Sequence, residues 1–358
     1  MSVPQKNFQV TVFFALISLV VLVSCSPKGS GTATGSIQLQ GAGATFPNPL
    51  YQKWVSEYGK LHSNVKIDYQ SIGSGGGIKQ IKEQTVDFGA SDAPMTDADL
   101  KAAPGELLHI PTVLGAVVMT YNLQGVTQTL HFSPDVVADI FLGKIKRWND
   151  PRVTADNAGA KLPAADITVV HRSDGSGTSA VFTDYLSKVS PEWKEKVGTG
   201  PSPSWPVGIG GKGNEGVTGQ VKNTPNTIGY VELVYAVQNK LPVAQLKNAS
   251  GAFVEPSPGS VMAAAADSAA KTPDDLRMSI TNAPGAQAYP ISSYTYVLLY
   301  KNQKDATKGK VLVDFLWWGV HDGKPFVQEM GYVPLPDDIL KRTEGKINSV
   351  TAGGALLR

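Results

Sequence analysis

Residues 166–186 read DITVVHRSDGSGTSAVFTDYL, and this stretch predicts a strand that leads through a polar turn into a helix. The β-branched residues Ile167, Val169 and Val170 are typical of a buried strand. After the turn, apolar side chains recur at the spacing of one helix face: Ala180, Val181, Phe182, Tyr185 and Leu186. This order of strand, loop and helix indicates an α/β fold.

The turn itself, HRSDGSGTS at residues 171–179, has the composition of an anion site. Ser176, Thr178 and Ser179 are residue types that cap helix N-termini, and the two glycines allow backbone N–H groups to approach a ligand closely. Arg172 can add a planar, permanently charged fork that suits phosphate or carboxylate. The alternative is an ordinary capped turn in which Arg172 pairs with Asp174 at the surface. An enzyme is less well supported, because residues 175–177 (GSG) lack the order of a nucleophile elbow and no Walker lysine follows.

The N-terminus has the features of a bacterial lipoprotein signal. Lys6 precedes an apolar run over residues 10–23, which is too short for a comfortable membrane span. The run ends in Leu-Val-Ser-Cys, and this lipobox predicts that Cys25 is lipidated with acyl chains such as palmitate. The alternative is an incidental cysteine. We therefore expect a signal peptide over residues 1–24, a lipidated tether over residues 25–36, and an exported protein anchored to a bacterial membrane, facing the periplasm or the cell exterior.

Size and charge exclude several classes of protein. Removing residues 1–24 from the 358-residue chain leaves 334, which favours two domains, and the net charge falls from +2 to about +1. No basic run alternates with aromatic residues, so nucleic acid is not an expected partner. With one Cys, five His and no HExxH or paired CxxC motif, neither a metal nor another cofactor is expected.

Three further loops resemble the turn at Ser176, because each follows a predicted strand and carries a hydroxyl. They contain Thr45, Ser74 and Ser91. Open α/β sheets bind ligands where such loops converge at the carboxyl ends of the strands. A fifth loop, GIGGKGNEG at residues 208–216, is explained equally well by ligand contact and by turn chemistry. We therefore expect the hydroxyl-bearing loops to meet at one site.

Two long apolar segments, residues 110–121 and 289–300, are predicted to be partner strands that cross between two lobes. Such a pair of crossings would make a hinge. The alternative is two ordinary core strands. The expected organisation is lobe I from residues 37–111 and 290–358, and lobe II from residues 112–289.

Taken together, the chain resembles the phosphate-binding proteins of bacterial high-affinity ABC phosphate transporters. The resemblance runs over nearly the whole mature chain, through GAGATFP, GSGGGIKQI, VDFGASDAP, LGKIKRWND, HRSDGSGTS, GGKGNEGV, IGYVE and GYVPLP. It implies the type II periplasmic binding protein fold, with two α/β lobes joined by two hinge crossings and the ligand cleft between them. It also implies transmembrane permease subunits as partners, a monomer, and no enzymatic activity.

The resemblance places the phosphate contacts on eight residues: Thr45, Phe46, Ser74, Asp92, Arg172, Ser176, Gly177 and Thr178. It assigns Asp174 to holding the arginine, with Gly73, Gly75 and Ser91 supporting the loops. Two alternatives stay open: a receptor for another tetrahedral oxyanion, and a phosphoesterase on the same scaffold, in which His171 could act as a base only if it faces the cleft. The lipid anchor is a departure from the freely soluble members of the family and depends on Cys25 alone.

Overall fold

A computed structural model describes residues 1–2, 35–266 and 271–358. Residues 36–358 form one compact unit. Apart from residues 1–2, the predicted signal peptide lies outside the described residues, as does nearly all of the tether, including Cys25. No helix in the described part of the chain is long and apolar enough to cross a membrane.

The unit is built on an eight-stranded sheet with the strand order β2-β1-β3-β11-β4-β8-β6-β7. These strands are β1 (Ile37–Gly43), β2 (Val65–Ser71), β3 (Phe88–Ser91), β4 (Leu107–Asn122), β6 (Thr168–Arg172), β7 (Ile209–Gly211), β8 (Thr227–Glu232) and β11 (Ser292–Tyr300). β1 is parallel to β2 and β3, and β6 is parallel to β7 and β8, whereas β4 and β11 are antiparallel to their neighbours. The sheet therefore contains two parallel groups, with β11 and β4 between them.

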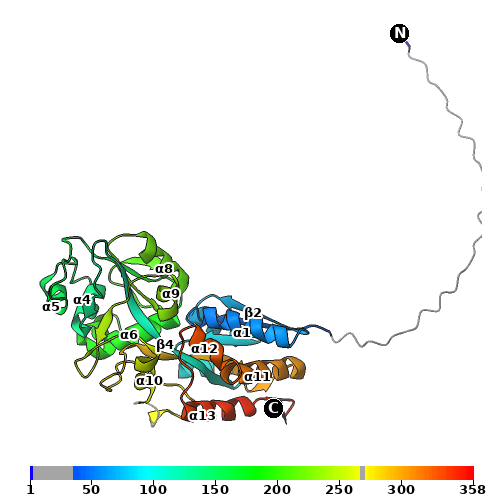
Figure 1. Ribbon diagram of the computed structural model, residues 1–358. Coiled ribbons are helices and arrows are strands. Elements are labelled where there is room, and N and C mark those ends of the chain that lie inside the picture. Colours follow the sequence, from blue (N-terminus) through cyan, green and yellow to red (C-terminus); the bar gives the residue numbers. More distant parts are fainter. Residues whose placement is uncertain (3–34, 267–270) are drawn as a thin grey trace, which may run out of the picture. The chain divides into compact units, whose positions relative to one another are not determined.

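β4 joins the two groups because it is long enough to pair with a different strand at each end. Residues 107–116 pair with β11, and residues 117–122 pair with β8. In Figure 1, β4 lies between helices α8 and α9 on one side and α11 and α12 on the other. The prediction that residues 110–121 and 289–300 are partner strands is confirmed. The assignment of lobe I and lobe II on either side of this pair stays a prediction.

The structure describes thirteen helices, one of which, α6, is the helix predicted to follow the turn at Ser176. They are α1 (Asn48–Leu61), α2 (Ser74–Lys82), α3 (Asp97–Lys101), α4 (Pro134–Phe141), α5 (Pro151–Asp156), α6 (Gly177–Val189), α7 (Pro191–Lys196), α8 (Gly213–Asn223), α9 (Leu233–Gln238), α10 (Pro258–Ala266), α11 (Ala306–Val320), α12 (Lys324–Glu329) and α13 (Asp337–Asn348). Short strands form two small sheets: β5 (His131–Phe132), β9 (Gln245–Lys247) and β10 (Phe253–Val254), and β12 (Asn302–Gln303), β13 (Thr351–Ala352) and β14 (Ala355–Leu356).

Aromatic side chains at helical spacing anchor these helices to the core. In α1, Trp54 and Tyr58 lie one turn apart and are both buried, and each packs edge-on against Phe315 of α11. In α6, Phe182 stacks on Tyr230 of β8 with 4.4 Å between ring centroids. These core contacts hold α1 and α6 in place, and the candidate site lies at the N-terminal ends of the two helices.

Candidate functional site

The hydroxyl-bearing loops meet at the carboxyl ends of the parallel strands. The Asp92 backbone N–H donates to the Ser74 Oγ at 3.3 Å, which joins the loop after β3 to the start of α2. A Cβ atom on Gly177, the first residue of α6, would lie 2.3 Å from the Ser74 Oγ and 2.6 Å from the Asp92 Oδ2. Only glycine allows this close approach. The loops after β2, β3 and β6 therefore converge, although they come from the two different parallel groups of the sheet.

Arg172 provides the positive charge of the site, and Asp174 holds it. The guanidinium of Arg172 is 2% exposed and makes two bonds to Asp174, Nε–Oδ1 at 2.8 Å and Nη2–Oδ2 at 2.5 Å. Its Nη1 donates to the Thr178 Oγ1 at 3.4 Å. Burial opposes ionisation of Asp174, but the Arg172 guanidinium holds the pKa of Asp174 below its usual value. The surface pairing that the alternative interpretation of this turn requires is wrong, because Arg172 is buried and the Asp174 side chain is only 12% exposed.

Asp92 contributes an acceptor that the protein leaves unpaired. The side chain is 2% exposed, and its Oδ1 accepts a hydrogen bond from the Thr295 Oγ1 at 2.9 Å. Its Oδ2 is buried and has no hydrogen-bond partner among the described residues. Burial raises the pKa of Asp92 to about 7, against the opposing effects of the Thr295 hydrogen bond, the Arg172 charge and the nearby Ser74 and Thr178 hydroxyls. A buried, unpartnered carboxylate oxygen is costly for the protein, which favours a role in binding a hydrogen-bond donor.

The start of α6 supplies side-chain hydroxyls and backbone N–H groups. Ser176 is the N-cap, and its Oγ accepts from the Ser179 backbone N–H at 3.0 Å. The Ser176 oxygen is therefore an acceptor within the helix, and its hydroxyl proton is left to donate. Gly177 and Thr178 lie in the first turn, where backbone N–H groups have no partner inside the helix. Thr178 is fully buried, with its hydroxyl against Arg172.

Thr45 and Phe46 lie between β1 and α1. Thr45 is 2% exposed, and its Oγ1 accepts from the Asn214 Nδ2 at 2.8 Å. Phe46 is fully buried with its ring 6.3 Å from that of Tyr332, and its carbonyl accepts from the Tyr332 hydroxyl at 2.7 Å. The Phe46 ring therefore belongs to the core, and a contribution of this residue to a ligand site would come from its backbone.

The supporting residues order the loops rather than supplying further donors. Gly73 has a φ of +88°, and a Cβ there would lie 2.3 Å from the Asp174 Oδ2. The Gly75 N–H donates to the Gly175 carbonyl at 2.8 Å, which links the loop after β2 directly to the loop after β6. The Ser91 hydroxyl donates to the Ala93 carbonyl at 2.5 Å, so it stabilises the loop that carries Asp92.

Two residues of the site were not predicted to belong to it. Asn214, in the loop that the sequence left open between ligand contact and turn chemistry, is fully buried and donates to both Thr45 and Thr178. Thr295 holds Asp92 but lies inside β11, where the sequence shows only a run of strand-forming residues. The periodicity of a strand gives no sign that one of its side chains reaches a distant loop.

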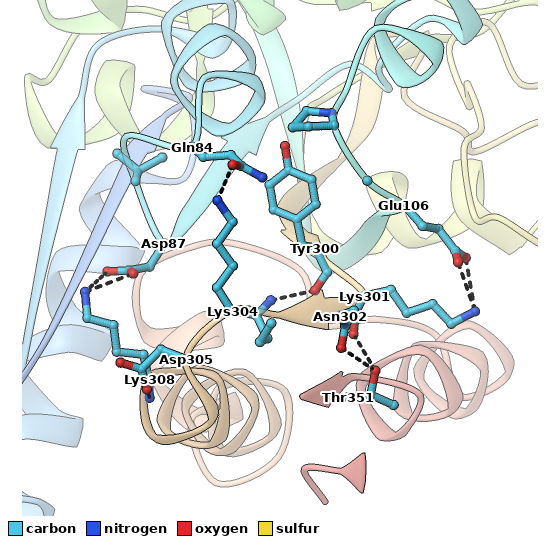
Figure 2. A pocket seen from close by; sticks show the side chains of 14 residues that line it. Gln84, Asp87, Glu106, Tyr300, Lys301, Asn302, Lys304, Asp305, Lys308 and Thr351 are labelled. Atoms are coloured by element: carbon cyan, nitrogen blue, oxygen red, sulfur yellow. Dashed lines mark hydrogen bonds and ion pairs between the residues drawn. The ribbon is translucent and has the colours of Figure 1, made fainter. Parts of the chain in front are cut away.

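Another cavity, of about 540 Å³, lies at the opposite end of the same strands and does not have the character of an anion site (Figure 2). It is lined by residues that precede β3 and β4 and by the end of β11. Its lysines are already paired: Lys301 with Glu106, Lys308 with Asp87, and Lys304 with the Gln84 Oε1. Three carboxylates, those of Asp87, Glu106 and Asp305, line the same cavity and balance the charges of its three lysines, in contrast to the convergent loops around Arg172.

Known proteins resemble this chain over most of its length. A family model described as a PBP superfamily domain matches residues 28–317. The chain is 43% identical to the phosphate-binding protein PstS of Xylella fastidiosa (strain 9a5c), over 92% of this chain and 94% of that protein. It is 48% identical to PstS of Pasteurella multocida, over 86% and 89% of the two chains.

Solved structures share the fold at lower sequence identity. A putative phosphate ABC transporter substrate-binding protein with bound phosphate from Clostridium perfringens has a TM-score of 0.62 at 17% identity, over 84% of this chain and 100% of that chain. A phosphate-binding protein from Stenotrophomonas maltophilia has a TM-score of 0.66 at 21% identity, over 86% and 93% of the chains. These likenesses confirm the predicted periplasmic binding protein fold, and the extent of identity with the curated relatives shows that the chain belongs to the PstS family of phosphate-binding proteins within the PBP superfamily.

Proposed function

We propose that this protein binds inorganic phosphate with high affinity outside the cytoplasmic membrane and delivers it to the permease subunits of an ABC transporter. The PstS relatives carry phosphate binding in their names, and the Clostridium perfringens structure holds bound phosphate. The observation that carries the proposal is the buried, unpartnered Oδ2 of Asp92 next to the first turn of α6. An acceptor at that point selects an anion that still carries a proton.

The chemistry of the convergent loops suits a desolvated phosphate. A buried anion is stable only if its oxygens receive hydrogen bonds, and hydroxyls, backbone N–H groups and one guanidinium can supply them here. In this proposal Thr45, Ser74, Arg172 and Thr178 donate from their side chains. The hydroxyl proton of Ser176, the first-turn N–H groups of α6 and the backbone N–H of Phe46 complete the donor set, whereas the Ser176 backbone N–H already donates to the Pro201 carbonyl at 2.9 Å.

The two groups of strands would act as lobes that close over the ligand. Thr45, Ser74 and Asp92 follow strands of one group, whereas Arg172 ends β6 of the other group and Thr178 follows it. The pair of β4 and β11, which lies between the groups, would be the hinge. Because the donors come from both lobes, phosphate would bind the closed state better than the open state and shift the equilibrium toward closure.

Calorimetric titration with phosphate, sulfate and arsenate tests this function. We expect strong binding of phosphate, binding of the protonated analogue arsenate, and no heat with sulfate. Sulfate binding at the strength of phosphate would instead support a general receptor for tetrahedral oxyanions. Turnover of p-nitrophenyl phosphate would support a phosphoesterase. In a phosphoesterase His171 would be the candidate base, and in the structure its ring stacks on the ring of Trp205 with 5.0 Å between the ring centroids.

We also propose that Cys25 is lipidated and tethers the protein to the membrane surface. The support is the sequence Leu-Val-Ser-Cys after a short apolar run. Cys25→Ser should move the protein to the soluble fraction and leave the Kd for phosphate unchanged. Equal recovery of the variant and the parent in membranes would contradict the anchor.

A further inference from the structure

Asn214 is the second residue of α8 and is fully buried, and its amide has only one possible orientation. The Glu232 backbone N–H donates to the Asn214 Oδ1 at 3.0 Å. Because a backbone N–H can only donate, the oxygen of the amide must face Glu232. The NH₂ group must then face the other way, where it lies 2.8 Å from the Thr45 Oγ1 and 3.1 Å from the Thr178 Oγ1.

Each of the two threonine hydroxyl oxygens consequently accepts hydrogen bonds from two protein donors. The Thr45 Oγ1 accepts from the Asn214 Nδ2 and also from the Asn214 backbone N–H at 3.1 Å. The Thr178 Oγ1 accepts from the Asn214 Nδ2 and from the Arg172 Nη1 at 3.4 Å. A hydroxyl has two acceptor lone pairs and one proton. Both hydroxyls therefore have their acceptor capacity filled by protein donors, and only their protons are left to use.

We propose that Asn214 is a positioning residue that fixes the Thr45 and Thr178 hydroxyls as donors to phosphate. This inference rests on the proposed function. A free hydroxyl can rotate so that it points either a lone pair or its proton at the ligand. An ionised phosphate oxygen only accepts hydrogen bonds, so it is bound by a hydroxyl that points its proton at it and repelled by one that points a lone pair. By filling the lone pairs in advance, Asn214 removes the orientations that would repel the anion, which lowers the cost of ordering the site upon binding.

The same amide also joins the two parallel groups of the sheet. Thr45 follows β1, Thr178 follows β6, and each receives one of the two N–H bonds of a single NH₂ group. The two hydroxyls are therefore oriented together only when their loops have converged. Asp92 then provides a buried and unpartnered carboxylate oxygen, its Oδ2, as the acceptor for the proton of the ligand.

A double-mutant cycle tests whether Asn214 acts through the threonines. Asn214→Ala should weaken phosphate binding roughly 10- to 100-fold, the range for hydrogen bonds to a charged group. In the Thr45→Val and Thr178→Val backgrounds, the loss of phosphate affinity caused by Asn214→Ala should be smaller than in the parent by more than about threefold in each, because the hydroxyl to be oriented is already absent. Additive losses in both backgrounds would overturn the proposal.

The pH profile of Asn214→Asp provides an independent measurement and preserves the shape of the side chain. An ionised carboxylate accepts from both threonines and turns their protons away from phosphate, whereas a protonated one can donate again. The ratio of the Kd values of variant and parent should therefore be largest at about pH 8.5 and shrink toward about pH 5. A ratio that is constant with pH would contradict the proposed role.

Two controls separate this role from loss of stability and from failure of the proposed function. Asn157→Ala removes another buried amide, which bonds to the backbone of His131 and Val153 away from the site, and it should leave the Kd for phosphate unchanged. If the parent itself gives no heat with phosphate, the proposed function is wrong. If the parent binds phosphate but the cycle is additive and the Asn214→Asp ratio is flat, only the role of Asn214 is wrong.

Discussion

The Arg172 guanidinium and the Asp174 carboxylate form a two-point ion pair, with Nε–Oδ1 and Nη2–Oδ2 distances of 2.8 and 2.5 Å. Asp174 also accepts from the Gly213 backbone N–H at 3.0 Å, so the carboxylate is itself held in place. The pair fixes the plane of the guanidinium and directs its Nη1 toward Thr178. A buried anion requires a positively charged hydrogen-bond donor that is held in a fixed position, and the Arg172 guanidinium is such a donor.

Replacement of Arg172 by Ala should weaken phosphate binding by roughly 2–5 kcal/mol, because the ligand loses its countercharge and Asp174 is left buried without one. Arg172→Lys should recover only part of the affinity, since an ammonium lacks the planar fork. The measurement is the Kd from calorimetric titration. Arg147→Ala is the matched control, because Arg147 forms an exposed pair with Asp166. An Arg172→Ala affinity within about threefold of the parent would refute the assignment.

Gly73 should be required for closure of the site. A Cβ at this residue would lie 2.3 Å from the Asp174 Oδ2, on the opposite side of the convergent loops. We expect Gly73→Ala to lower phosphate affinity at least about tenfold, because the side chain separates two surfaces that must touch. Gly159→Ala is a close control, since Gly159 has the same φ of +88° but nothing within 4 Å of its Cβ position. Both variants carry similar backbone strain, so equal phosphate affinities in the two proteins would contradict the closure role.

His109 should make the folded protein less stable in acid. Its Nε2 accepts from the Met95 backbone N–H at 3.0 Å, and burial, assisted by the Arg277 charge and opposed by Asp275, lowers the pKa of His109 to about 4. The unfolded chain, with a His pKa of about 6.5, therefore binds more protons between these two values. Stability is lost as the pH falls from about 6.5 to about 4, by about 2 to 3 kcal/mol in total.

Denaturant unfolding of the parent and of His109→Gln at several pH values isolates this contribution, because other titrating groups are common to both proteins. The glutamine amide keeps an acceptor for Met95 but does not titrate. The difference in unfolding free energy between the two proteins should be constant above about pH 7.5 and should shift by the predicted amount toward about pH 4.5. A difference that stays constant over the whole range would show that His109 is not the group responsible.

The convergence of the loops could be predicted from the sequence, whereas the contacts that hold the loops could not. Thr45, Ser74, Asp92 and Thr178 each follow a predicted strand, and the parallel order of the strands brings their ends together. Thr295 reaches Asp92 because β11 pairs antiparallel with β3, with Tyr296 opposite Ser91, and this places Thr295 beside Asp92 at the end of β3. The register between two strands depends on their pairing and leaves no mark on the periodicity of either one.

One local boundary differs from the sequence pattern because a tertiary contact overrides helix propensity. The chain from residue 231 onward has a helical pattern, yet β8 continues to Glu232 and α9 begins at Leu233. Glu232 pairs with Val117 of β4, and its side chain caps α9 by accepting from the Val234 backbone N–H at 2.8 Å. The pairing with β4 thus extends the strand by two residues at the expense of the helix.

Asp92 should decide between phosphate and sulfate. At neutral pH phosphate keeps at least one proton, which the unpartnered Oδ2 of Asp92 can accept, whereas sulfate is fully ionised and would face a like charge without a hydrogen bond. Sites built around a hydrogen bond can reject an analogue that lacks it by factors of roughly 10⁴ or more. The competing role is that of a cap for the next helix. In the structure, however, Thr96 is the N-cap of α3, and its side chain accepts from the Asp99 backbone N–H.

Asp92→Asn distinguishes the two roles, because an amide removes the repulsion and can donate to sulfate. Burial raises the pKa of Asp92 to about 7, so the titrations belong at about pH 8.5, where the parent carboxylate is ionised. We expect sulfate binding to become measurable in Asp92→Asn, with the thermal midpoint close to that of the parent and phosphate bound more weakly, since one accepting oxygen is lost. Thr295→Val provides a milder comparison, since it removes the bond to the Asp92 Oδ1 and leaves the charge in place. If Asp92→Asn gives no heat with millimolar sulfate while its phosphate affinity is unchanged, Asp92 is not the selector and the discrimination must come from the donor groups around Arg172.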